Sequence, residues 1–232
     1  MLDWTRVTLY AEPGPHLVAR DVLPQERYDD LLRELPKPDA FEQVDKFKSD
    51  LTVADSDNET WRSFERHVVV PQIMPGIIER FRPDLERHFA ALFGSVDRAM
   101  AEPLVAHPGR LMLRRPGYAL EPHRDKLVSA ITVLLYLARP GDDPAFGTEI
   151  YQVHNDEPAN WLKTYYPQRH GATVTLAHTV PFVANTLCAF VNTVGMAHAA
   201  RLAVDCPQTE RYTYQFYIGH ERKAFLRLME SC

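Results

Sequence analysis

The sequence predicts a mainly β fold of the α+β class, in which an antiparallel sandwich or jelly roll has N-terminal helices packed outside it. Three observations lead to this prediction. Before about residue 109, apolar side chains repeat with the period of a helix. After residue 109 they form short β-branched runs, and turn residues rich in proline and glycine separate those runs.

Two amphipathic helices are predicted in the first third of the chain. In the first, which follows Pro24, apolar side chains fall at i, i+3, i+4 and i+7, namely Tyr28, Leu31, Leu32 and Leu35. The second has a similar spacing, ends before Gly94, and carries Leu85, Phe89, Leu92 and Phe93. Residues 45–61, between the helices, are polar without a clear period. We expect them to form a long loop that covers a site.

Strands are predicted for seven segments after residue 109. They are residues 110–114, 129–137, 148–153, 172–176, 186–191, 197–204 and 212–218. Turn signals such as Pro116-Gly117 and Pro140-Gly141 lie between them. Residues 154–170 form a second expected loop, and both loops are candidates for a lid over a ligand.

Composition limits the classes of protein that the chain can represent. No repeat or linker divides its 232 residues, so we expect a single domain: a mainly helical lead-in and lid (1–108), a jelly-roll core (109–218) and a C-terminal tail (219–232). The net charge of -5 argues against a nucleic-acid partner. The longest apolar run, 130–138, is too short to cross a membrane, and no signal peptide is visible. Three cysteines without a CxxC pair suggest reduced thiols in a cytoplasmic protein.

The segment His123-Arg124-Asp125 is the sharpest local feature. On an extended chain, residues two apart point to the same face, so one imidazole and one carboxylate can reach a single cation. A third ligand should come from a distant strand. His198 follows a strand and a short turn and is preferred, while His178 near another strand end is its rival. Two histidines and one carboxylate with open positions suit non-haem Fe(II).

Several segments, in their order along the chain, resemble the Fe(II)/2-oxoglutarate-dependent dioxygenases, in particular the prolyl-hydroxylase-like branch. They are Leu113-Arg114-Arg115-Pro116-Gly117, Glu121-Pro122-His123-Arg124-Asp125, residues 132–137, Gly147-Thr148-Glu149-Ile150, and Phe190-Val191-Asn192 through to His198. The resemblance covers roughly residues 110–218 and implies a double-stranded β-helix, a cupin-like barrel. Two positions depart from the family pattern: Arg114 replaces an aromatic residue, and Thr148 replaces the second glycine of a pair.

The resemblance also implies roles for individual residues. The iron ligands would be His123, Asp125 and His198. Arg211 would bind the distal carboxylate of 2-oxoglutarate, since a planar guanidinium can hold a carboxylate through two hydrogen bonds. Arg201 is the alternative, although it lies an odd number of residues from His198 and would face the other side of a regular strand. Tyr136 matches a tyrosine that commonly hydrogen-bonds the same carboxylate.

The activity that the resemblance implies is an oxidation by O2 that uses Fe(II) and 2-oxoglutarate and releases succinate and CO2. Asp125 keeps the carboxylate that related halogenases lack, which favours hydroxylation, or another oxidation such as desaturation or ring formation, over halogenation. A single short domain favours a small metabolite, an amino acid or a peptidyl residue as the substrate. Side chains expected to contact the substrate are Arg124, Trp161, Tyr165 and Tyr166, with Trp61 and Arg169 as further candidates.

Two alternatives remain at this point. One is a cupin-like metalloenzyme that does not use 2-oxoglutarate, and the other is a silent ligand-binding barrel. Arg211 together with Tyr136 distinguishes the oxygenase from the first alternative. A complete set of three ligands distinguishes both enzymes from the second.

Overall fold

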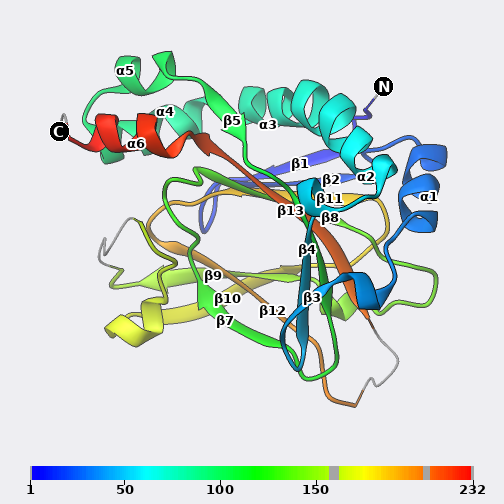
Figure 1. Cartoon of the computed structure of the whole chain (residues 1–232). Coiled ribbons are helices and arrows are strands. Elements are labelled where there is room, and N and C mark those ends of the chain that lie inside the picture. The colour runs from blue at the N-terminus through cyan, green and yellow to red at the C-terminus, as the bar shows by residue number, and fades with distance from the viewer. Residues whose placement is uncertain (1, 157–161, 206–209, 231–232) are drawn as a thin grey trace.

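Two antiparallel sheets face each other, and helices cover the outer side of the larger sheet (Figure 1). The computed structural model describes residues 2–156, 162–205 and 210–230. All strand pairs within these residues are antiparallel. The prediction of a mainly β fold with helices is therefore confirmed.

The larger sheet has the order β1-β2-β11-β8-β13-β6-β4-β3, with β5 also paired to β13. Its strands are β1 (Val7–Tyr10), β2 (His16–Arg20), β3 (Glu42–Asp45), β4 (Lys48–Thr52), β5 (Leu104–Ala106), β6 (Arg110–Arg114), β8 (Ile131–Tyr136), β11 (Thr186–Val191) and β13 (Arg211–His220). The smaller sheet has the order β10-β9-β12-β7. Its strands are β7 (Ala119–His123), β9 (Thr148–His154), β10 (Thr173–Val180) and β12 (Met196–Arg201).

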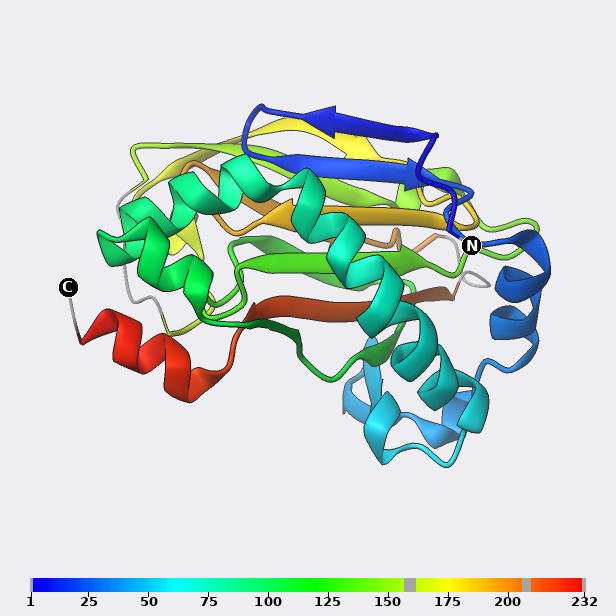
Figure 2. The same cartoon turned by 90° about the horizontal axis from the view of Figure 1, so that it is seen from above.

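Helices lie mostly on one side of the larger sheet, and the view from above shows a long helical run crossing its strands (Figure 2). The α-helices are α1 (Gln25–Arg33), α2 (Glu59–Phe64), α3 (Met74–Arg80), α4 (Arg82–Phe93), α5 (Val96–Ala101) and α6 (Arg222–Met229). A π-helical stretch, η3 (Glu65–Ile73), joins α2 to α3, and short 3-10 turns are η1 (Pro38–Ala40), η2 (Val53–Asp55), η4 (Pro144–Phe146) and η5 (Pro167–His170). Both predicted helices are present, as α1 and α4. Gly94 ends α4 with a φ of 64°, a conformation that glycine adopts without strain.

The two faces of the larger sheet belong to different parts of the interior. Residues at alternate positions of its central strands join the helices in one large apolar cluster, which includes Val133, Ala189 and Phe216 together with Trp61 and Phe89. The opposite face meets the smaller sheet, and a second cluster there joins Leu134 and Phe190 to Ile150. The period-2 alternation of a strand thus separates a helix-facing core from an inter-sheet space.

The expectation of a long loop over residues 45–61 is wrong. Within this segment β4 pairs along its whole length with β6, and α2 begins at Glu59. The polar residues of β4 conceal the strand in the sequence, because apolar alternation is the signal on which such a prediction depends. Trp61 is fully buried between Phe64 and Tyr214, so it belongs to the core and does not contact a ligand.

The lead-in also contains more β-structure than the sequence suggests, since β1 to β5 all lie before residue 109. The hairpin of β1 and β2 extends the larger sheet beyond β11. None of the helices in the described part of the chain combines the length and apolarity needed to cross a bilayer.

Candidate metal centre

The smaller sheet brings the three predicted ligands together. His123 ends β7, and its register partner on β12 is His198, while Asp125 follows two residues after the end of β7. One ligand atom from each residue lies within 4.8 Å of the other two. His123 Nε2 is 3.7 Å from Asp125 Oδ1, and His198 Nε2 is 3.6 Å from Asp125 Oδ2. These separations are too long for hydrogen bonds but suit three donors arranged around one ion.

Hydrogen bonds outside the ligand set hold two of the ligands in place. His123 Nδ1 donates to the carbonyl of Glu121 at 3.0 Å, which leaves the lone pair of Nε2 directed at the shared centre. The Thr132 hydroxyl donates to Asp125 Oδ2 at 2.8 Å. Asn192 Nδ2 in turn donates to Thr132 Oγ1 at 3.0 Å and to the carbonyl of Ser129 at 2.6 Å.

The protonation states of the buried ligands suit a cation. Burial alone would raise the pKa of Asp125, but His198, His123 and the Thr132 hydrogen bond outweigh burial and lower it. Burial lowers the pKa of His198 to about 3. An ionised carboxylate and a neutral imidazole are the forms that bind a metal. Asp125 and His198 are therefore in their metal-binding forms at neutral pH.

No other set of three metal-binding side chains was found within the described residues. The rival ligand, His178, lies on β10 instead, where its Nε2 is 3.1 Å from Nε2 of His16. Two imidazoles and one carboxylate on one side of an ion form the set typical of non-haem Fe(II). The residues present thus fit that metal.

A cavity of about 430 Å³ opens beside the three ligands. Its walls come from both sheets and from the segments that follow β7 and precede β10. The polar and aromatic side chains on these walls include those of His123, Asp125, His198, Lys48, Arg110, Arg114, Lys126, Thr148, Tyr166, Arg211, Gln215 and Tyr217.

Arg211 begins β13 and lines this cavity although only 2 % of its surface is exposed. Its Nε donates to the carbonyl of Phe146 at 2.7 Å, and Nη2 donates to Thr148 Oγ1 at 3.4 Å. Arg201, the alternative, is exposed and pairs with Glu149 at 3.1 Å. Only Arg211 of the two faces the cavity.

Tyr136 lies behind Arg211 and is not part of the cavity wall. Its hydroxyl donates to Thr148 Oγ1 at 2.7 Å and accepts from Thr148 N at 3.2 Å. Its ring lies 5.5 Å from the Arg211 guanidinium. Thr148, the departure from the family's glycine pair, therefore links the two predicted 2-oxoglutarate residues. The glycine that remains, Gly147, lets its backbone lie close to the backbone of Val180. A Cβ at Gly147 would lie 1.8 Å from the carbonyl oxygen of Val180.

The predicted substrate contacts are dispersed in the structure. Tyr166 lines the cavity, and its ring stacks on His123 with centroids 5.7 Å apart. Arg124 points elsewhere: it is 3 % exposed, is absent from the cavity wall and binds Asp156 at 2.6 Å. Tyr165 is buried beneath Arg124. Arg169 is exposed and pairs with Glu121. Trp161 lies outside the described residues.

Comparison with known proteins identifies the fold. No family profile matches the sequence, and no curated protein has significant sequence similarity to it. Solved structures do match. HygX from Streptomyces hygroscopicus, with nickel, 2-oxoglutarate and hygromycin B bound, has a TM-score of 0.55 at 15% identity, over 89% of this chain and 83% of that one. The chain has the fold of the iron- and 2-oxoglutarate-dependent oxygenases.

Two further structures support this assignment. A Trichoplax adhaerens prolyl hydroxylase in complex with a hypoxia inducible factor peptide has a TM-score of 0.56 at 13% identity, over 91% of this chain and 86% of that one. The epimerase SnoN, in complex with Fe3+, alpha ketoglutarate and nogalamycin RO, has a TM-score of 0.53 at 14% identity, over 88% and 78%. The fold family that the ordered motifs predicted is confirmed.

Sequence reasoning missed several side chains around the centre. Thr132 is an ordinary strand residue in the sequence, Thr148 stands out only as a departure from the family pattern, and Arg110 opens a predicted strand without any motif. Thr132 lies on the same face of β8 as Tyr136, so alternation from Tyr136 could have indicated it. Arg110 had no such signal, because its role depends on what β13 places beside it.

Proposed function

We propose that this chain is a non-haem oxygenase that binds Fe(II) through His123, Asp125 and His198. Arg211 binds the distal carboxylate of 2-oxoglutarate in the same cavity. The observation that carries the proposal is the presence of a buried facial ligand set and a buried, cavity-facing arginine on the walls of one cavity. The two facing sheets then correspond to the double-stranded β-helix of that fold.

When bound, iron and 2-oxoglutarate supply the oxidation of a substrate C–H bond by O2, with release of succinate and CO2. The chain itself contributes orientation and exclusion of water. Thr132 and Asn192 hold the Asp125 carboxylate, and the Glu121 carbonyl fixes the tautomer of His123. Thr148 and the Phe146 carbonyl aim the Arg211 guanidinium at the cavity.

Hydroxylation is the reaction that we favour. Asp125 provides a carboxylate at the third ligand position, and that carboxylate leaves no room for a halide. The fold alone does not choose the reaction, since SnoN is an epimerase. A cavity of about 430 Å³ falls in the range of small-molecule sites and fits a small metabolite, an amino acid or one peptidyl residue. Tyr166, stacked on His123, is positioned to contact it.

An anaerobic titration with Fe(II) and 2-oxoglutarate tests the proposal. A weak visible charge-transfer band should develop only when both are present. His123→Ala should abolish the band, whereas the control His154→Ala, which changes an exposed histidine at the end of β9, should not. Arg211→Met should retain metal binding and weaken 2-oxoglutarate binding, and Arg201→Met should leave both unchanged.

Two results would count against the proposal. Absence of the band in wild-type protein, with His123→Ala behaving identically, would exclude an iron and 2-oxoglutarate centre. Metal binding without any effect of 2-oxoglutarate would indicate the cupin-like metalloenzyme instead. Succinate release in air would then be absent as well.

A further inference from the structure

The cavity carries more positive charge than the proposed cofactors neutralise. Its described walls include five cationic side chains, Lys48, Arg110, Arg114, Lys126 and Arg211, but a single carboxylate, that of Asp125. The charges of Fe(II), 2-oxoglutarate, Asp125 and Arg211 would cancel one another. Four cations then remain on the walls of a chain whose net charge is -5.

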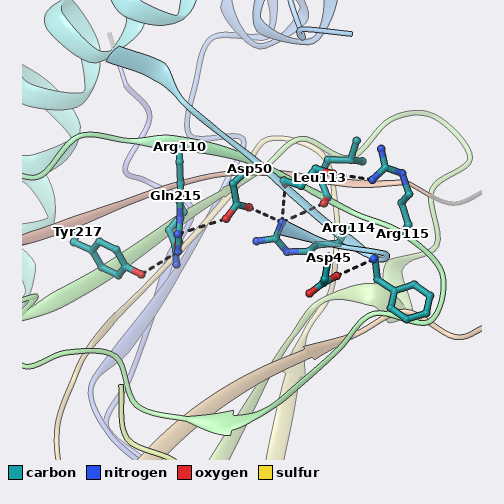
Figure 3. A network of polar contacts seen from close by, with 10 residues as sticks. Asp45, Asp50, Arg110, Leu113, Arg114, Arg115, Gln215 and Tyr217 are labelled. Carbon is teal, nitrogen blue, oxygen red and sulfur yellow. Dashed lines mark hydrogen bonds and ion pairs between the residues drawn. The ribbon is translucent and has the colours of Figure 1, made fainter. Parts of the chain in front are cut away.

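One of these four already has a protein partner. Arg114, 3 % exposed, donates through Nη1 to Asp50 Oδ1 at 2.6 Å and to the carbonyl of Ser49 at 2.9 Å. Figure 3 shows Asp50 between Arg114 and Arg110. The second contact of Asp50 is longer, since Arg110 Nη1 lies 3.6 Å from Oδ2. Asp50 is therefore shared between two arginines, and its shorter contact is with Arg114.

The hydrogen bonds of Arg110 are with neutral groups, although the Asp125 carboxylate lies near enough to interact with it electrostatically. Its Nε donates to Gln215 Oε1 at 2.8 Å, and Nη2 donates to Gln215 and, at 3.3 Å, to the hydroxyl of Tyr217 (Figure 3). These contacts orient the guanidinium without neutralising it. Because 37% of its side chain is exposed and it lines the cavity, Arg110 is open to an anion from the cavity side.

Beside Arg110, the polar groups of Gln215 and Tyr217 that do not already bind it are hydrogen-bond donors. Gln215 and Tyr217 both accept from Arg110, which leaves the amide N–H groups and the phenolic O–H to donate. No described residue accepts a hydrogen bond from either group, although both side chains line the cavity. Lys126 lies at the exposed rim and forms no ion pair within the described residues. Arg110, Gln215, Tyr217 and Lys126 thus add four donors to a cavity wall whose one described carboxylate, Asp125, belongs to the metal ligand set.

This donor cluster lies apart from Arg211 on the same face of the sheet. Gln215 is the register partner of Arg110, and Arg211 is the register partner of Arg114. Four residues of strand separate the two pairs, a span of about 13 Å. The cluster and the 2-oxoglutarate arginine therefore form different ends of one cavity.

We infer that Arg110, together with Gln215, Tyr217 and Lys126, binds an oxyanion of the substrate, a carboxylate or a phosphate group. The inference rests on the proposed function, which assigns the Arg211 end to 2-oxoglutarate. Gln215 and Tyr217 hold Nε and Nη2, so an oxyanion would accept from Nη1 of Arg110 and from the Gln215 amide and the Tyr217 hydroxyl beside it. Anchored there, the substrate directs its remaining atoms toward the metal centre.

Calorimetric titration with inorganic phosphate and, separately, with acetate tests the inference. The protein is kept anaerobic, saturated with Fe(II) and 2-oxoglutarate, and at constant ionic strength. We expect at least one of the two anions to bind, with the same Kd for wild-type protein and for the control variant Arg201→Met. Arg110→Met should weaken that binding about tenfold or more, and Arg110→Lys should have an intermediate effect. The Kd of 2-oxoglutarate should stay within about twofold, as expected for separate sites.

Stronger binding of phosphate or of acetate identifies which oxyanion the site prefers. Wild-type protein that binds neither anion, or Arg110→Met protein that binds as well as wild type, would overturn the inference. So would an equal loss of 2-oxoglutarate affinity in Arg110→Met, which would assign Arg110 to the cosubstrate. The same titration of metal-free Arg211→Met protein separates the two proposals, because Arg110-dependent anion binding there does not require iron or 2-oxoglutarate.

Discussion

The two faces of β13 perform different tasks although they belong to one strand. Tyr212, Tyr214, Phe216 and Ile218 join the apolar core beneath the helices. The residues that alternate with them are polar, and Arg211, Gln215 and Tyr217 line the cavity. The same backbone therefore supports both the folding core and the candidate active site.

The difference shows how a cavity rich in charge is maintained inside a stable protein. Burying a polar or charged group costs free energy unless it is hydrogen-bonded. On the cavity face each buried group that we assign a role has a partner, such as Phe146 for Arg211 or Thr132 for Asp125. The helix-facing side supplies the apolar burial that stabilises the fold. Substitutions on the two faces should consequently affect different measurements.

The largest effect is expected from Asp125→Ala, which removes the carboxylate ligand. Iron affinity should fall by more than about 100-fold, because even the outer partners of metal ligands contribute 10–100-fold. The free energy of unfolding of the metal-free protein should change by less than about 2 kcal/mol. Equilibrium dialysis against iron and urea denaturation provide the two measurements. Asp55→Ala, which changes an exposed carboxylate, is the control, and retained iron binding in Asp125→Ala would contradict the assignment.

Phe216→Ala should have the opposite pattern. Phe216 is 1 % exposed in the helix-facing core, so its truncation should destabilise the protein by about 3–5 kcal/mol. At a temperature where the variant is folded, its Kd for 2-oxoglutarate should equal that of the wild type. Urea denaturation and calorimetry test these expectations. A large change in Kd with little loss of stability would show that the two faces are not separate.

Thr132→Val sharpens the comparison within the cavity face. It removes the hydrogen bond to Asp125 Oδ2 and should weaken iron binding by about 10–100-fold. Thr213→Val is a matched control, since Thr213 has a buried hydroxyl without a partner among the described residues. That control should bind iron normally and be no less stable than wild type. Equal iron affinities in the two variants would exclude an orienting role for Thr132.

The smallest expected effect is a pH dependence of stability caused by His88 in the helix layer. Burial lowers the pKa of His88 on α4 to about 4. As the pH falls below 6.5, His88 becomes protonated in the unfolded state but stays neutral in the folded state. The free energy of unfolding therefore decreases as the pH falls from 6.5 toward 4. At pH 5.5 the loss due to His88 should be about 1 kcal/mol.

Urea denaturation of metal-free protein at pH 7.5 and 5.5 measures this loss. His88→Phe should be less sensitive to acid than wild type by that amount. The other histidines contribute equally to both proteins and cancel in the comparison. The same pH dependence in both proteins would show that His88 is not responsible.

Local sequence patterns predicted the elements whose apolar periodicity is strong. β6 and β11 begin and end where their predicted apolar runs do, and α1 and α4 lie where the two helices were predicted. Prediction failed for β4, whose residues are Lys48-Ser49-Asp50-Leu51-Thr52. Two of these polar residues serve the cavity rather than a core, Lys48 as part of its wall and Asp50 as a partner of its arginines. A strand of this kind has no hydrophobic signal.

The sequence by itself determined the fold class and the ligand set of the candidate metal centre. His123 and Asp125 are neighbours along the chain, and the order of the motifs placed His198 with them. Only the tertiary structure decided between Arg211 and Arg201 as the cavity-facing arginine and brought Arg110 beside Gln215, which is 105 residues away. Short-range spacing constrains what one strand can present, whereas pairing of distant strands determines which side chains share a cavity.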